Sequence, residues 1–194
     1  MLTTEFTKAQ PEYVSVSLDD YAVITLTGPQ TDQFLQGQLS CDMKELTSQA
    51  WLYAAHCDNK GKALSTLFVA RWGDKVVLIN HKDAIAASLA QLQKFGVFSQ
   101  TEIVDATAQW QLYGVFGTQA QAKLTELLQQ PLNESTPQAV TATATDLVLQ
   151  VGTAPAQFIL ISAPNRLPTS ASPEVWQALE IERRRPTLVS GTLE

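Results

Sequence analysis

The chain has few of the residues from which metal centres, disulfide scaffolds and nucleic-acid surfaces are usually built. Its 194 residues include only two cysteines, Cys41 and Cys57, and two histidines, His56 and His81. None of them has metal-ligand spacing, and such a cysteine content suits free thiols in a reducing compartment. Lysine and arginine number 13 against 19 acidic residues, and the resulting formal net charge of -6 argues against broad phosphate-backbone binding.

Long apolar runs and targeting segments are also missing. Residues 1–10 lack the basic start and apolar core of a signal peptide, and no segment reaches transmembrane length. We therefore predict a cytoplasmic protein that does not enter membranes. No phosphate-cradling glycine loop and no Ser-His-Asp arrangement is visible. A content of 45% hydrophobic and 16% charged residues is typical of a globular protein with one large or two small cores.

The clearest local pattern is a hairpin centred on Asp58-Asn59-Lys60-Gly61. Apolar runs over 51–57 and 63–72 flank this turn, and Asn and Gly tolerate the positive φ of a tight antiparallel connection. His56 is interpreted as a polar residue that pins the hairpin and Cys57 as a small buried hydrophobe. A Cys-His dyad is improbable because neighbouring strand residues point to opposite faces.

Periodicity elsewhere predicts an α+β fold built on antiparallel sheet. Asp83 is expected to cap one of the helices or to favour its dipole. Surface connections are expected over 131–145 and 167–173. The predicted strands cover 21–27, 51–57, 63–72, 75–80, 97–104, 111–116, 146–151 and 157–162, and the predicted helices cover 31–39, 83–95, 119–128 and 173–183.

Several blocks of sequence together resemble one known family. These blocks are 17–22 with 24–28, 34–39 with Asp42, the segment 54–62, 94–95 with 97–99, and 176–182. They resemble the YgfZ-type folate-binding, tRNA-modifying proteins, which are relatives of the aminomethyltransferase (T-protein) of the glycine cleavage system.

The resemblance implies a fold of two ferredoxin-like lobes that face each other across a cavity. We place the first lobe at 1–105 and the second at 106–194. The family also has a C-terminal β-barrel, which we expect to be absent from this chain. The family's Lys-Gly-Cys-x-x-Gly-Gln-Glu segment is absent too, because it lies downstream of the matched region.

The resemblance also implies a folate site that contains Tyr21, Trp176 and Glu182. Tyr21 occupies a position where the family usually has Trp, and Glu182 matches an acid that contacts the pterin in the aminomethyltransferases. An aromatic face and a carboxylate are what a pterin requires. From residue type alone, Tyr21 and Trp176 are core aromatics. The run 183–185 of arginines is interpreted as a solvated helix end rather than a grip for a folate tail or RNA phosphate.

Catalytic aminomethyl transfer is not expected. The positions that match the aminomethyltransferase carboxylate are Ser65 and Thr66, and a hydroxyl does not replace an ionised acid at neutral pH. We therefore assign no catalytic and no metal-binding residue. The favoured function is binding of tetrahydrofolate or a derivative, without catalysis by the chain itself, in tRNA modification and in maintenance of iron-sulfur enzymes.

The partners implied by the resemblance are a folate and iron-sulfur tRNA-modifying enzymes. Direct tRNA contact is disfavoured by the net charge and would have to be local. Two alternatives stay open: a folate-dependent one-carbon transferase, and a ligand-free interaction domain of the same fold.

Overall fold

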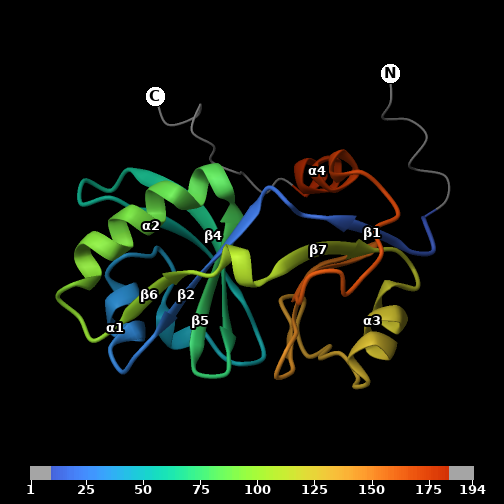
Figure 1. The fold of residues 1–194 in the computed structure, drawn as a ribbon, viewed down its shortest axis with the longest axis horizontal. Coiled ribbons are helices and arrows are strands. Elements are labelled where there is room, and N and C mark those ends of the chain that lie inside the picture. The colour runs from blue at the N-terminus through green and yellow to red at the C-terminus, as the bar shows by residue number, and fades with distance from the viewer. Residues whose placement is uncertain (1–9, 184–194) are drawn as a thin grey trace.

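The computed structural model describes residues 10–183, which form two five-stranded antiparallel sheets lying side by side (Figure 1). Sheet I has the strand order β3-β4-β5-β2-β6, and sheet II has the order β1-β7-β10-β9-β8. The strands of sheet I are β2 (Tyr21–Thr27), β3 (Leu52–Cys57), β4 (Ala63–Trp72), β5 (Lys75–His81) and β6 (Glu102–Asp105). The strands of sheet II are β1 (Val14–Ser17), β7 (Gln111–Phe116), β8 (Val140–Ala142), β9 (Leu147–Thr153) and β10 (Ala156–Ser162).

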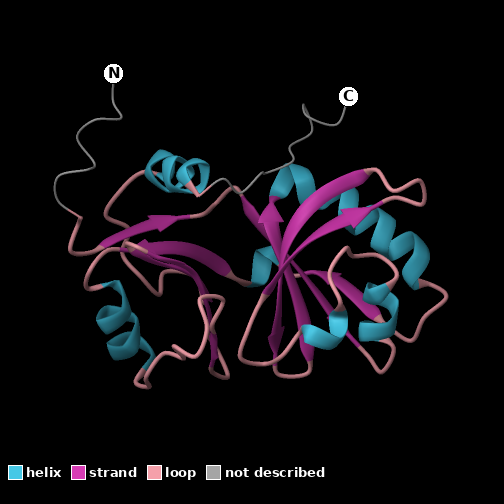
Figure 2. Ribbon diagram, turned by 180° about the vertical axis from the view of Figure 1, so that it is seen from behind, coloured by secondary structure: helices cyan, strands magenta, loops and turns pink. Residues whose placement is uncertain are grey.

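The first three α-helices cover the outer faces of the two sheets, and the fourth lies on the opposite face of sheet II from the third (Figure 2). The first two α-helices pack on sheet I, the third packs on β10, and the fourth packs along β1. The helical elements are α1 (Thr31–Gln36), η1 (Met43–Glu45), α2 (Lys82–Gly96), η2 (Thr107–Gln109), α3 (Ala120–Leu128) and α4 (Pro173–Glu182). Within the described part of the chain, no helix combines the length and apolar character that a membrane span requires.

The two sheets share a core between their inner faces. Successive residues of β5 point to opposite faces, so Val77 and Ile79 enter this shared core while Val76 and Leu78 pack under the helices. Cover on both faces explains why β5 is apolar without alternation. Two indole N–H groups also join the sheets: Trp51 donates to the Gln150 carbonyl at 2.7 Å, and Trp72 donates to the Thr143 carbonyl at 2.8 Å.

The predicted hairpin is confirmed. The Asp58 N–H donates to the Lys62 carbonyl at 2.9 Å, and the Asp58 carboxylate accepts from the N–H groups of Lys60 and Lys62. Gly61 has a φ of 80°, which a glycine adopts without strain. The turn chemistry that defined this hairpin is local in sequence, and local signals survive folding.

Three local predictions were wrong, and a fourth was wrong in part. Residues 97–100 are a turn rather than a strand, because Phe98 and Ser99 donate back to the end of α2. The predicted connection 131–145 contains β8, which pairs with β9. The helix predicted over 31–39 ends at Gln36, before Gly37. Of the two roles expected for Asp83, the cap is wrong, since the cap position is His81, whereas its place in the first turn of α2 suits the helix dipole.

The lobe boundary at 105/106 stays a prediction. The strands of sheet I lie between residues 21 and 105, but β1 joins β7 of sheet II in antiparallel register, with Val14 opposite Phe116. The N-terminal strand therefore crosses to the other sheet. This crossing places the turn after β1 next to α4, where the candidate site lies.

Candidate functional site

A small hollow lies where the turn between β1 and β2, the end of β5 and the start of α4 meet. Both predicted aromatic residues, Tyr21 and Trp176, line it, although they come from opposite ends of the chain. Its water-accessible volume is about 10 Å³, which is space for about one water molecule. The protein's own side chains therefore fill most of the position that a pteridine ring would require. The other lining residues are Leu18, Asp19, Asp20, His81, Pro173 and Gln177.

Tyr21 forms one wall of this hollow from the first position of β2. It pairs directly with His81 across the β2–β5 ladder, and the two rings lie 4.2 Å apart with their planes at 39°. The Tyr21 side chain is 4% exposed and belongs to the shared core. Both interpretations from the sequence thus apply to Tyr21, because it is a core aromatic residue and also lines the hollow.

Trp176 forms the opposite wall and is 1% exposed. Its ring lies on the backbone of Gly114 in β7, where an added Cβ would be 2.4 Å from Trp176 Cε3. Only a glycine at position 114 allows α4 to lie so close to sheet II. The indole N–H of Trp176 is buried and has no hydrogen-bond partner within residues 10–183, although such a group normally has one.

Glu182 lies apart from the two aromatic residues. It is exposed at the last position of α4 and does not line the hollow. Six positions along a helix turn the side chain away from Trp176, whereas four positions return to the same face. The acid on that face is Glu180, which is 8% exposed. The structure therefore brings together two of the three predicted site residues.

Arg183 is not a solvated helix end. Its guanidinium lies against Gly152 of β9, where an added Cβ would be 2.1 Å from Arg183 Cζ, and it donates to the Pro155 carbonyl at 3.1 Å. The side chain therefore connects the end of α4 to the β9–β10 turn. Positions 184 and 185 of the arginine run lie outside the described residues.

The rim of the hollow is acidic and contains one titratable imidazole. Burial lowers the pKa of His81, while the nearby carboxylates of Asp20 and Asp83 act in the opposite direction. Asp19 accepts a hydrogen bond from the Ser17 hydroxyl. These carboxylates and the imidazole can accept hydrogen bonds from the N–H groups of a planar heterocycle.

The two positions that match the family's catalytic carboxylate point to different faces of β4. The Ser65 hydroxyl is fully buried and lies 2.6 Å from the Ser88 hydroxyl of α2, on the face away from the hollow. Thr66 lies on the opposite face and is half-buried, and its carbonyl accepts from the Asn80 side chain. Neither position supplies an ionisable acid.

His56 does not pin the hairpin, so that prediction was wrong. The residue is fully buried opposite Ser65, on the α2 side of sheet I, and neither ring nitrogen has a hydrogen-bond partner in the described part of the chain. Burial lowers the pKa of His56 to about 4. Cys57 is only half-buried. Among residues 10–183, no group of three or more His, Cys, Asp or Glu side chains is arranged to hold a metal ion.

Comparison with curated proteins tests the family resemblance. A protein of Sodalis glossinidius, named tRNA-modifying protein YgfZ, is 37% identical over 187 residues, which are 91% of this chain and 56% of that protein. A protein of the same name from Colwellia psychrerythraea is 32% identical over 190 residues, which are 94% of this chain and 58% of that protein. The resemblance to the YgfZ-type family is confirmed. The chain spans little more than half the length of these YgfZ proteins, and no family model matches it.

Solved structures confirm the predicted fold. The glycine cleavage system aminomethyltransferase T of Bartonella henselae superposes with a TM-score of 0.69 at 18% identity, covering 80% of this chain and 43% of that chain. A heterotetrameric sarcosine oxidase of Corynebacterium sp. U-96 gives 0.50 at 13% identity, covering 78% and 75%. The chain thus has the aminomethyltransferase fold of two antiparallel sheets with packed helices, and residues 10–183 form no closed barrel.

Sequence reasoning missed the polar lining of the hollow. His81 had been considered only as one of two histidines, and Asp19 and Asp20 only as part of a matched block. Their proximity to Trp176 follows from the pairing of β2 with β5 and from the position of α4. An explicit pairing of residues 21 and 81 across a predicted antiparallel ladder could have identified His81.

Proposed function

We propose that the chain binds tetrahydrofolate or a derivative between Tyr21 and Trp176 and acts, without catalysis of its own, in tRNA modification. The observation that carries this proposal is the convergence of these two aromatic residues on one hollow. Aromatic side chains offer a flat pteridine its stacking surface. A bound ring nitrogen or carbonyl would also give the buried indole N–H of Trp176 the acceptor that it lacks within residues 10–183.

Binding requires the hollow to open. Its volume of about 10 Å³ does not admit a pteridine, so α4 must move away from the turn between β1 and β2. The segment before α4 is tied to β1 at Ser15, which accepts from the N–H groups of Ser170 and Ala171. These bonds lie ahead of the helix, so α4 can tilt about this attachment while sheet II keeps its pairing, once the hydrogen bond from Arg183 to the Pro155 carbonyl at the other end of α4 breaks.

Two acids compete for the role of pterin partner. Glu182 is assigned by the family resemblance and lies outside the closed hollow, whereas Asp20 already lines it. A carboxylate paired with the amino and N–H edge of a pterin contributes about 1.5 to 3 kcal/mol. Comparison of Glu182→Gln with Asp20→Asn therefore identifies the acid. Only substitution of the acid that pairs with the pterin should lower the affinity of the chain for the folate about tenfold or more.

The cellular role rests on the relatives. Their name supports a part in tRNA modification, and the family resemblance extends this role to maintenance of iron-sulfur enzymes, which are the proposed protein partners. The net charge of -6 disfavours extensive contact with tRNA by the chain itself. Expression of the chain in a bacterial strain without its own YgfZ protein tests this role. Recovery of modified tRNA nucleosides, measured by mass spectrometry, is expected for the parent and not for the Trp176 variant described below.

Calorimetric titration with 5-formyltetrahydrofolate tests the ligand. We expect saturable heat and a loss of about tenfold in affinity for Trp176→Phe, which removes the indole N–H. The matched control is Trp110→Phe. Trp110 packs on Trp72 with ring centroids 4.7 Å apart and does not line the hollow. The affinity of the Trp110→Phe variant for the folate should stay within twofold of that of the parent. Absence of heat, together with no folate-dependent rise in melting temperature, would reject folate binding and favour the ligand-free interaction domain.

A further inference from the structure

Three outer edges of the two sheets are covered by other parts of the chain. An exposed edge offers unpaired backbone donors and acceptors, and proteins usually cover or shorten such edges. The covers here are backbone hydrogen bonds from Ser170 to Ser15 along β1, from Ser40 to Ala55 along β3, and from Val140 of β8 to Gln49. The remaining edge is that of β6.

The outer edge of β6 is open within residues 10–183. The Ala106 N–H donates to the Val23 carbonyl at 2.9 Å, and Val104 pairs with Thr25 of β2. Because backbone groups alternate in direction along a strand, the N–H and C=O groups of Ile103 and Asp105 point away from β2. No described residue forms a hydrogen bond with these backbone groups. They are available to another extended chain.

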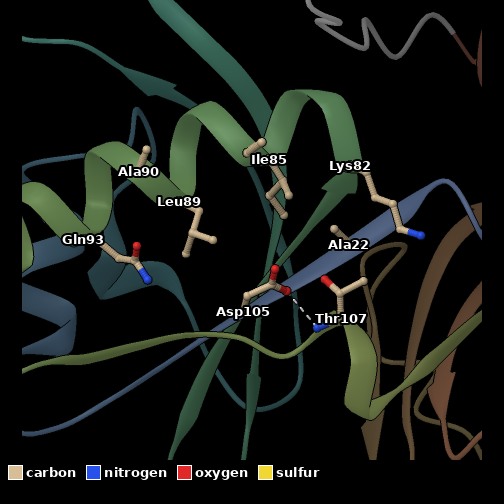
Figure 3. A pocket seen from close by; sticks show the side chains of 9 residues that line it. Ala22, Lys82, Ile85, Leu89, Ala90, Gln93, Asp105 and Thr107 are labelled. Carbon is tan, nitrogen blue, oxygen red and sulfur yellow. Dashed lines mark hydrogen bonds between the residues drawn. The ribbon is translucent and has the colours of Figure 1, made fainter.

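A groove runs beside this edge, between β6 and α2 (Figure 3). Its volume is about 330 Å³, and its apolar surface includes Ala22, Ile85 and Leu89. Figure 3 shows Leu89 extending from α2 toward β6, and Asp105 extending from β6 toward the helix. Small side chains at Ala86 and Ala90 leave the helix side of the groove open. An edge strand next to an apolar groove along a helix is an arrangement that accepts peptides as an added strand.

The geometry points to a docking site for an extended segment of a partner protein, which pairs with β6 and inserts an aliphatic side chain between α2 and β6. The open backbone groups of Ile103 and Asp105 require an extended chain rather than a helix or a small molecule. The apolar surface of Ile85 and Leu89 selects the aliphatic side chain. This site is separate from the hollow and does not depend on folate binding.

Charge favours a basic residue in the docking segment. β6 carries carboxylates at both ends, Glu102 and Asp105, and neither forms an ion pair in the described part of the chain. Side chains of an added strand would lie about 4.5 to 5.5 Å from those of β6, close enough for an opposite-charge pair. Lys82 lies on the helix side of the groove. Asp105 lies on the groove side of β6 and Glu102 on the opposite face, so either face of an added strand meets a carboxylate. The net charge of -6 outweighs the single cation Lys82.

Exposed apolar side chains continue the apolar surface beyond one end of the groove. Val97 and Phe98, in the turn between α2 and β6, are 74% and 87% exposed. Two adjacent large apolar side chains with such exposure are unusual on a protein surface and typical of an interaction site. They follow Gln93, which lines the groove near the end of α2. A docking segment longer than β6 would cover them.

A phage-displayed library of random linear 12-residue peptides, panned against the whole chain, tests this inference. We expect enriched peptides with alternating aliphatic residues and at least one lysine or arginine. Ala86→Arg fills the groove and should lower the affinity for the tightest-binding synthetic peptide at least tenfold. Ala87→Arg is the matched control, because Ala87 is the next exposed alanine of α2 and does not line the groove. The affinity of the Ala87→Arg variant for the same peptide should change less than twofold.

Amide hydrogen exchange locates the peptide on the strand. Addition to β6 should slow exchange at Ile103 and Asp105, whose N–H groups point outward, without a comparable change at Val104. Failure to enrich any peptide, equal binding by Ala86→Arg, or peptide binding without protection at Ile103 and Asp105 would overturn the inference. Concentration-dependent dimerisation with that same protection would also overturn it, because the occupant would be a second copy of the chain.

Discussion

Adjacent residues of β2 line two very different sites. Tyr21 faces the hollow beside the start of α4, whereas Ala22 faces the groove beside α2. The hollow has two aromatic walls and a volume of about 10 Å³, while the groove is lined by aliphatic and polar side chains without an aromatic residue and has a volume of about 330 Å³. Distinctive residue types thus marked the smaller site, and the larger one carries no motif at all. Cavity size and recognisable chemistry are independent properties of a surface.

The two histidines lie on opposite faces of sheet I, His56 on the α2 side and His81 on the side of the hollow. We expect His56 to contribute more to the loss of stability in acid. The pKa of His56 falls from 6.5 to about 4 on folding because burial disfavours the imidazolium. Between these values the unfolded chain binds a proton that the folded chain does not. The free energy of unfolding therefore has its full value above pH 6.5 and falls as the pH decreases toward 4. The loss amounts to roughly 3 kcal/mol.

Urea unfolding at pH 7.5 and pH 4.5 measures this loss. His56→Leu should remove most of the decrease that is due to histidine. His81→Leu is the control on the hollow side, where Asp20 and Asp83 oppose the effect of burial on the pKa, and it should change the pH dependence less. An unchanged pH dependence in His56→Leu would show that this imidazole is not the cause.

Gly114→Ala should disrupt the hollow and spare the groove. The added methyl would lie 2.4 Å from Trp176 Cε3, so either α4 or β7 must shift, at a cost of about 2 kcal/mol. Unfolding followed by tryptophan fluorescence measures this cost. Gly37→Ala is the matched control, because its nearest neighbour would be the Phe34 carbonyl oxygen at 3.6 Å. Loss of peptide binding at β6 in Gly114→Ala would show that the two sites are coupled.

The smallest expected effect concerns the serine pair under α2. Ser88→Ala leaves the fully buried Ser65 hydroxyl without its partner at 2.6 Å, and should cost about 1 kcal/mol of unfolding free energy. The double variant Ser65→Ala with Ser88→Ala should recover most of this loss, because no unsatisfied hydroxyl remains. A double variant less stable than Ser88→Ala would contradict this account.

Prediction from sequence succeeded where the signal is local. The turn at 58–61, the apolar strands β4 and β5, and the amphipathic helix α2 all follow from neighbouring residues. The short strands β1 and β8 were not predicted. Each has at most four residues, too few to show a clear alternation. The partner of β1 is β7, about 100 residues away in the chain, whereas β8 pairs with the nearby β9. Val97 and Phe98 suggested a strand because apolar residues are usually buried, yet both are exposed.

Prediction of the candidate site also succeeded for some residues and failed for others. Tyr21 and Trp176 were identified by residue type and family resemblance, and they do lie in one hollow. The separation of Glu182 from Trp176 was missed although the predicted helix 173–183 contained both, because six positions along a helix lead to a different face. The contribution of His81 depended on the β2–β5 register.

Turn chemistry and apolar periodicity, which act over a few residues, determined from sequence alone an α+β fold with antiparallel sheet, and the family resemblance added its arrangement in two lobes. Only the tertiary structure decided that Gly114 allows Trp176 to close the hollow and that β6 keeps an open edge. Both features depend on contacts between segments distant in the chain. Such contacts are set by the packing of whole elements, which no local pattern encodes.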